Sequence, residues 1–223
     1  IMQLLFPEGG DCGITITANG VDYTYDYDPG DVWKTNNYTA LTTTSLWTAP
    51  TTADPFAAFK TVKDAIRSKT GEELTIAIMN TYTFNLMAAT DAVKNRYLTT
   101  NGLSLGYLTD TEVKSIVEAT SGLRIAVYDK QYKDESGTAH SFVPDGYVCL
   151  IPAGNLGNTW YGTTPEEADL QGASSAEVSI VNTGVAITRE IQNHPVNINT
   201  FASEIVLPSY ERMDSVGVLK VIA

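Results

Sequence analysis

The sequence predicts a mixed α+β fold in which helices and strands are interspersed along the chain. Two kinds of pattern lead to this prediction. Apolar residues recur at helical spacing behind capping residues, and short alternating or wholly apolar runs are typical of strands. The chain has 223 residues and 43% hydrophobic content, which is enough for one large domain or two small ones with a buried core.

Residues 14–28 predict a β-hairpin. The dipeptide Asn19-Gly20, which tolerates the positive φ angles of a tight hairpin turn, separates two alternating runs. Because strand side chains alternate between faces, Val21 and the tyrosines that follow it share one face, and the acidic residues share the other. We expect one face to pack and the other to meet water or a charged partner.

Three helices are predicted from their terminal residues. Asp54 can accept hydrogen bonds from free amides ahead of an apolar stripe over 55–68, where Pro55 suits the first helical position. A Thr-x-x-Glu capping box precedes a helix over 110–120. The capping and terminating residues of the three helices are Asp54, Gly71, Asn80, Thr109, Glu112 and Gly122.

The remaining segments predict strands and loops. The strand candidates are 74–79, 123–128, 147–151, 158–161, 184–192 and 214–222. The irregular candidates are extended structure and loop over 33–53, a less regular stretch over 90–108, a polar turn at 133–137, a short helical turn over 163–167 and an exposed loop over 172–177.

No catalytic constellation is recognisable in the sequence. The chain lacks the Gly-x-Ser-x-Gly and His-Glu-x-x-His patterns, and its two histidines, His140 and His194, fall in predicted turn or loop regions. Cys12 and Cys149 match neither a metal-ligand spacing nor a disulfide framework, which favours an intracellular assembly compartment. Cys149 lies inside an apolar run, and we expect it to be a buried free thiol.

An acidic stretch is the strongest alternative signal. Hard cations such as Ca²⁺ require several carboxylates that converge on one point, whereas alternate strand residues lie ~7 Å apart. The stretch therefore favours a solvated or interface-forming strand face, and metal binding stays open as the alternative. Its residues are Asp22, Asp26, Asp28 and Asp31. The pair Glu166-Glu167 stands in the first turn of a predicted helical segment, where the helix dipole favours acids.

The charge distribution argues against tight nucleic-acid binding. The net charge is −12 with 14 Lys and Arg residues, and none of them forms a dense patch. No apolar run approaches the ~18 residues that a membrane helix needs, and no basic segment precedes an apolar one at the start. We therefore expect neither specific nucleic-acid binding nor a membrane segment nor a cofactor.

Six groups of residues, taken together, resemble one known family. They are Ile14 to Tyr27 with Leu46-Trp47, Asp54-Pro55 with Phe59 to Lys63, Ile125 to Tyr128 with Gln131-Tyr132, Phe142 to Gly146, Tyr161-Gly162 with Glu166 to Asp169, and Asp214 to Val218. This order of segments is similar to the lambda-type major capsid proteins of tailed phages, the capsid protein E family. The likeness covers nearly all 223 residues.

The resemblance implies a Hong Kong 97-type capsid fold. It implies a peripheral-domain portion over 1–53, an axial domain over 54–180 and returning peripheral strands over 181–223. It also implies that the chain is truncated at its amino end, because the arm, extended loop and spine helix of the family would precede it, with Ile1 to Leu5 at their tail. The tip of the axial domain is expected at Asn101 to Tyr107 or Asp134 to Gly137.

The resemblance further implies a structural subunit of an icosahedral phage or prophage head, without enzymatic activity, that packages DNA by self-assembly. Its partners would be further copies in pentamers and hexamers, with scaffold, protease or decoration proteins in addition. Its location would be the virion, after assembly in the bacterial host cytoplasm. Two alternatives remain: another phage structural protein such as a decoration or tail component, and an enzyme or metal-dependent binding protein that uses Asp22 to Asp31.

Overall fold

The computed structural model describes residues 12–18, 21–101, 108–133, 136–164, 177–182, 185–194 and 196–223. The chain divides into two compact units. Unit 1 comprises Ile1–Gly154 and Arg212–Ala223, and unit 2 comprises Asn155–Glu211. The described elements follow the interspersed α+β pattern that the sequence predicts.

A five-stranded mixed sheet lies at the centre of unit 1. Its order is β3 (Tyr38–Ala40), β13 (Gly217–Lys220), β8 (Tyr147–Pro152), β4 (Leu74–Met79) and β5 (Arg124–Val127). The pairs β3/β13 and β4/β5 are parallel, and β8 runs antiparallel to both of its neighbours. The strands at 74–79 and 147–152 match the predicted strands.

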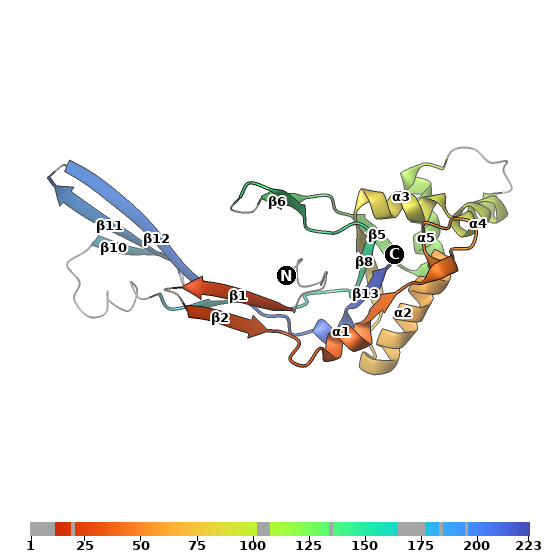
Figure 1. The fold of residues 1–223 in the computed structure, drawn as a ribbon, viewed down its shortest axis with the longest axis horizontal. Helices are drawn as coiled ribbons and strands as arrows, with labels where there is room; N and C mark the ends of the chain where they lie inside the picture. Colours follow the sequence, from red (N-terminus) through yellow and green to blue (C-terminus); the bar gives the residue numbers. More distant parts are fainter. Residues whose placement is uncertain are drawn as a thin grey trace. The chain divides into compact units, whose positions relative to one another are not determined.

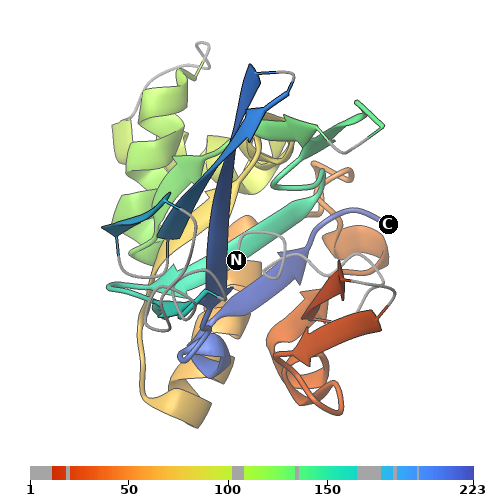
Figure 2. The same cartoon turned by 90° about the vertical axis from the view of Figure 1, so that its left-hand side faces the viewer.

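Four helices cover one face of this sheet (Figure 1, Figure 2). They are α2 (Pro55–Thr70), α3 (Thr81–Ala89), α4 (Asp91–Asn101) and α5 (Asp110–Ser121). Phe59 of α2 is fully buried and packs edge-on against Trp47, with ring centroids 5.7 Å apart. Apolar residues from all four helices and from β4, β8 and β13 form one contiguous core, whose burial stabilises the unit.

The predicted helix caps are present. The Asp54 carboxylate accepts from the amides of Phe56 and Ala57 at 3.0 and 3.2 Å, and the Asn80 side chain accepts from the Thr83 amide at 2.9 Å. The capping box at the start of α5 is complete. Gly71 and Gly122 end α2 and α5 with φ of 73° and 70°, a left-handed conformation that glycine adopts without a steric penalty.

Two helices arise where the sequence predicts irregular structure. Residues 33–53 contain most of α1 (Val32–Asn37), together with β3 and the 3₁₀ turn η2 (Thr43–Ser45), and residues 90–108 contain α4. Trp33 and Val93 are the buried residues that anchor α1 and α4, at 3% and 0% exposure. A helix held by so few apolar contacts produces little periodic signal in the sequence. The two helices were therefore not predicted, although β3 agrees with the extended structure expected within 33–53.

Two hairpins complete unit 1. The predicted hairpin at 14–28 is present as β1 (Gly13–Ala18) and β2 (Val21–Asp26), in antiparallel register from Gly13 opposite Asp26 to Ala18 opposite Val21. The second hairpin consists of β6 (Gln131–Lys133) and β7 (Ala139–Ser141), on either side of the predicted polar turn.

Unit 2 is an antiparallel sheet of four strands. Its order is β10 (Glu177–Asn182), β11 (Val185–Asn193), β12 (Val196–Pro208) and β9 (Thr159–Gly162). The strands at 158–161 and 184–192 match the predictions, whereas the 13-residue β12 was not predicted. Among its described residues, only Ala186 and Tyr210 are buried apolar side chains.

The predicted boundaries do not coincide with the two compact units. The last strand, predicted over 214–222, was expected to pack with the strands near 184–192, but β13 lies inside the sheet of unit 1. The reason is its composition: Val218, Leu219 and Val221 are all fully buried, and a strand with both faces apolar needs an interior position. The boundary at 180/181 would also separate two paired strands, β10 and β11.

Several predictions lie outside the described residues. They concern Ile1 to Leu5, the turn Asn19-Gly20, the tip Asn101 to Tyr107 apart from Asn101 itself, the residues 134 and 135 of the second tip, the pair Glu166-Glu167 and the loop 172–177 apart from Glu177.

Candidate functional site

The acidic stretch, which begins in β2 and continues into the turn after it, has a structural role at its buried residue, Asp28. Asp28 is 7% exposed, and its two carboxylate oxygens accept from the backbone amides of Trp33 and Lys34 at 2.8 and 2.9 Å. These amides belong to the first turn of α1, where the amide groups lack partners within the helix. Asp28 therefore caps α1 and fixes the connection between the hairpin and the rest of unit 1.

The other acidic residues do not converge with Asp28 on a cation site. Asp22 and Asp26 are exposed on the same face of β2, and Asp31 lies 4.0 Å from Lys34. Across the described part of the chain, no group of three or more His, Cys, Asp or Glu side chains is placed to hold a metal ion. Asp26 instead accepts a hydrogen bond from the Asp28 amide at 2.9 Å, so the acidic face of the hairpin is exposed without forming a cation site.

The two histidines and two cysteines do not assemble a reactive centre with each other. His140 of β7 stacks on Tyr132, with ring centroids 5.4 Å apart, whereas His194 is an exposed residue of unit 2. Burial raises the pKa of the Cys12 thiol to about 11, with the nearby Asp28 carboxylate adding to the effect. Burial also raises the pKa of the fully buried Cys149 well above its usual range, so both residues stay protonated.

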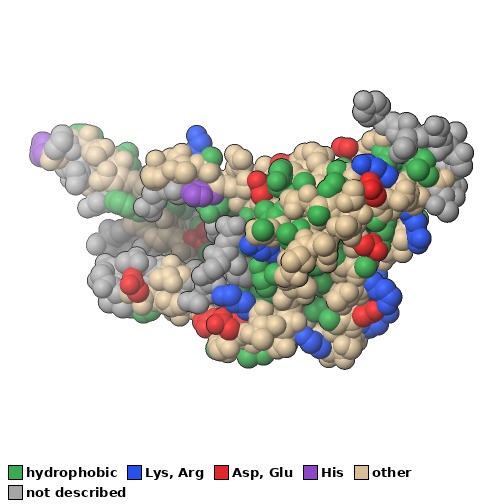
Figure 3. All heavy atoms as spheres, turned by 45° about the vertical axis from the view of Figure 1, so that its right-hand side comes forward, with side chains coloured by type: hydrophobic (Ala, Val, Ile, Leu, Met, Phe, Trp, Pro, Cys, Tyr) green, Lys and Arg blue, Asp and Glu red, His purple; other side chains and the backbone are tan. Residues whose placement is uncertain are grey.

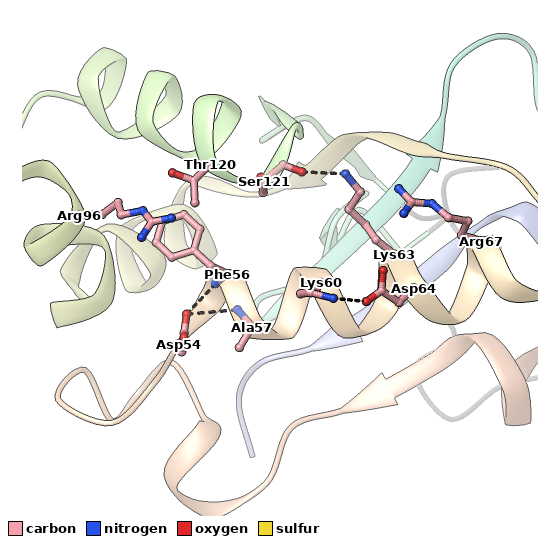
Figure 4. A pocket seen from close by; sticks show the side chains of 10 residues that line it. All are labelled: Asp54, Phe56, Ala57, Lys60, Lys63, Asp64, Arg67, Arg96, Thr120 and Ser121. Atoms are coloured by element: carbon pink, nitrogen blue, oxygen red, sulfur yellow. Dashed lines mark hydrogen bonds and ion pairs between the residues drawn. The ribbon is translucent and has the colours of Figure 1, made fainter. Parts of the chain in front are cut away.

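A pocket of about 420 Å³ opens between α2, α4 and the end of α5 (Figure 4). This volume lies within the range of small ligand sites. Phe56 and Ala57 provide its apolar wall, and the Arg96 guanidinium lies over the Phe56 ring at 5.9 Å from the centroid. The charged residues that line it are Asp54, Lys60, Lys63, Asp64, Arg67 and Arg96.

Carboxylates lie beside the three cations that α2 contributes to this pocket. Lys60 pairs with Asp64 one turn later on α2. Glu73 lies 3.6 Å from the Lys63 amine and 2.8 Å from the Arg67 guanidinium. The Lys63 amine also donates to the backbone oxygen of Ser121 at 2.7 Å, at the carboxyl end of α5. The pocket therefore combines positive charge with its own counter-ions.

The sequence did not predict this pocket. Its cations at 60, 63 and 67 lie off the apolar face of α2, and no local pattern shows that residues of α4 and α5 join them. Arg96 was missed because its segment was expected to be irregular. On the face that Figure 3 shows, Lys and Arg side chains lie mostly in small groups beside Asp and Glu.

Exposed apolar side chains gather on the sheet of unit 2. Ile191 lies opposite Ile198, and Tyr161 lies opposite Val206, at exposures of 40–61%. Opposite residues share a face, and positions 198 and 206 of β12 are an even number apart, so all four project from one side. Apolar residues that gather on one exposed face are a common feature of protein interaction sites.

Comparison with solved structures defines the class of fold. The chain is similar to the crystal structure of a protein described as a prophage capsid protein of Escherichia coli CFT073, with a TM-score of 0.67 and 17% identity. A phage-related protein of Bordetella bronchiseptica RB50 matches 83% of the chain with a TM-score of 0.50 and 13% identity. The chain therefore shares its mixed α+β fold with these two proteins.

The sequence then identifies the family. The profile of the phage major capsid protein E family matches residues 10–218, and the chain belongs to this family. No curated protein matches. The chain is covered completely by the first solved structure but spans 61% of that protein's length, and it spans 55% of the second.

Family membership implies a structural component of the virion. The family resemblance that the sequence predicted is thereby confirmed. Among the described helices, none combines the length and the apolar character that crossing a membrane requires.

Proposed function

We propose that this chain forms part of the structural subunit of the icosahedral head of a tailed phage or prophage. The observation that carries the proposal is the apolar face of unit 2, because a structural subunit must present such surfaces to its neighbours. Val196 and Ile198, at 84% and 55% exposure, extend this face along β12. The family membership and the fold support the same function.

The proposal includes a Hong Kong 97-type fold. In that arrangement the sheet and helices of unit 1 correspond to the axial domain, with the tip of this domain towards the capsomer axis. Unit 2 and the β1–β2 hairpin correspond to the peripheral domain. The subunit that contains this chain would form pentamers and hexamers and enclose DNA.

The proposed role is structural and not enzymatic. Asp28, the buried member of the acidic stretch, is committed to capping α1, so the stretch offers no convergent set of ligands for a metal-dependent activity. The subunit would assemble in the host cytoplasm with scaffold, protease or decoration proteins and would remain in the virion.

Electron microscopy of the gene product that contains this chain tests the proposal. Closed shells of uniform size are expected after expression and purification. Ile198→Asp should reduce the shells strongly, whereas Val32→Asp should leave them intact. Val32 is a matched control because it is an apolar residue of unit 1 with 60% exposure. Tubes, or particles that form only on shells of another protein, would instead indicate a tail or decoration component.

A further inference from the structure

The pocket between α2, α4 and α5 concentrates positive charge on an acidic chain. Four of the 14 Lys and Arg residues line it, and the chain carries a net charge of −12. The Lys60 and Arg67 side chains are 76% and 52% exposed, so both remain accessible from solvent although each has a carboxylate beside it. Such a site attracts carboxylates from other molecules, because every added copy of the chain brings an acidic surface.

The chemistry of the pocket favours isolated carboxylates over an extended polyanion. Asp64 and Glu73 already lie against its cations, and the Ser121 carbonyl belongs to the negative end of α5. A DNA backbone would bring a continuous row of phosphates against these groups. Two spaced carboxylate side chains can instead reach the cations individually.

The hairpin β1–β2 carries two carboxylates with suitable spacing. Asp22 and Asp26 lie on one face of β2, four residues and therefore ~13 Å apart. Lys60 and Arg67 are seven residues apart on one side of α2, about 10 Å along the helix axis. The long side chains of lysine and arginine can cover the remaining difference.

The described side chains of β2 in the same hairpin are open to solvent. All five residues from Asp22 to Asp26 are exposed, including Tyr23 at 63% and Tyr25 at 49%. A two-stranded hairpin is only marginally stable in water unless further strands or another surface cover it. A neighbouring molecule is therefore the expected partner of this ribbon.

We propose that the pocket of one subunit receives the Asp22 and Asp26 side chains from the hairpin of a neighbouring copy. This inference rests on the proposed function, because it specifies one contact within the assembly. The two surfaces differ, so the contact is heterologous, and heterologous contacts that close generate rings. A ring of this kind suits the pentamers and hexamers of a shell.

Reversing the charges of the pocket and of the hairpin, in the gene product that contains this chain, tests the contact. Lys60→Glu with Arg67→Glu, and separately Asp22→Lys with Asp26→Lys, should each lower the assembled fraction at least tenfold in sedimentation velocity. The variant with all four substitutions should recover to within about threefold of wild type, because the attraction is restored with reversed signs. Lys133→Glu is the matched control, since Lys133 is exposed on β6, and it should assemble normally.

A second measurement keeps the result independent of shell formation. A carbodiimide joins a carboxylate to an amine with loss of water, and mass spectrometry of an equimolar mixture of ¹⁴N- and ¹⁵N-labelled chains identifies crosslinks between copies. Mixed-isotope crosslinks from Asp22 or Asp26 to Lys60 or Lys63 support the proposal, even if no shells form and the proposed function fails. Absence of these crosslinks overturns the proposal. It is also overturned if the variant with all four substitutions does not recover assembly although circular dichroism shows that it is folded.

Binding to a short DNA duplex tests the alternative ligand. If the Lys60→Glu, Arg67→Glu variant loses this binding and no such crosslinks form, the pocket would be assigned to DNA instead.

Discussion

Unit 1 and unit 2 differ in how far their apolar side chains are buried. In unit 1, apolar side chains from the central sheet and all four covering helices bury one another in a single core. In unit 2, the described residues include only two buried apolar side chains but eight of the twelve large exposed ones found among the described residues. The difference indicates that unit 1 is stabilised by its own packing, whereas the surface of unit 2 is suited to contacts with other molecules.

The largest expected effect is the loss of a core aromatic residue in unit 1. Phe59→Ala removes a fully buried ring that packs on Trp47, and it should lower the free energy of unfolding by about 3–5 kcal/mol. Phe201→Ala in unit 2 removes a ring that is 54% exposed, and it should change stability by less than about 1 kcal/mol. Urea unfolding followed by tryptophan fluorescence measures both, because Trp33 and Trp47 lie in unit 1 and Trp160 lies in unit 2. Equal losses would contradict the comparison.

Adding a methyl group at a glycine should destabilise unit 1 more than unit 2. A Cβ at Gly217 would lie 2.5 Å from a methyl of Val62, inside the packed core, so Gly217→Ala should cost about 1–3 kcal/mol. A Cβ at Gly162 in unit 2 would lie 3.0 Å from the exposed Ile205 side chain, which can move aside. Gly162→Ala should therefore be tolerated in a thermal melt, and a loss as large as that of Gly217→Ala would show that unit 2 is packed as tightly as unit 1.

Removal of a helix cap should have an intermediate effect on unit 1. Asp54→Ala leaves two amides at the start of α2 without their acceptor, and it should cost about 1 kcal/mol. Asp54→Asn retains an acceptor oxygen and should restore most of the loss. The urea midpoint measures both variants, and a neutral Asp54→Ala would mean that packing alone positions the helix.

Acidification should weaken unit 1 through two exposed carboxylates. Hydrogen bonds from the Thr81 side chain and amide lower the pKa of Asp129, and those from the Thr109 amide and side chain and from Tyr97 lower the pKa of Glu112. The ionised forms are the bonded ones, so their stabilisation is present above the unfolded pKa values of 3.8 and 4.5 and is lost as pH falls through the lower folded values. Asp129→Asn with Glu112→Gln should therefore flatten the loss of stability between about pH 5 and pH 2 in urea titrations. An unchanged pH dependence would contradict this assignment.

The smallest expected effect on folding is a polar substitution on unit 2. Ile198 is 55% exposed, so Ile198→Asp should change the free energy of unfolding by less than about 0.5 kcal/mol. The same variant should reduce assembly of the gene product, as proposed above. Strong destabilisation of the isolated chain would show that this face is already covered within the molecule.

Local sequence patterns were sufficient to predict the capped helices and most of the strands. Asp54, Asn80 and Thr109 mark helix starts because a side-chain oxygen satisfies amides only two or three residues away. The alternation on either side of Asn19-Gly20 was likewise sufficient to predict β1 and β2. The capping role of Asp28 could not be predicted from such local signals, because its carboxylate accepts from amides five and six residues further along the chain.

The sequence by itself determined the α+β class, the family and the elements whose residues interact with near neighbours. The tertiary structure alone decided that β13 lies inside the sheet of unit 1, that α4 brings Arg96 to the pocket, and that an apolar face of unit 2 stays exposed. Caps and turns depend on chain geometry over a few residues, which composition and spacing reveal. Strand order, pockets and exposed faces depend on contacts between residues far apart in the chain, and no local pattern encodes which of those contacts has the lowest free energy.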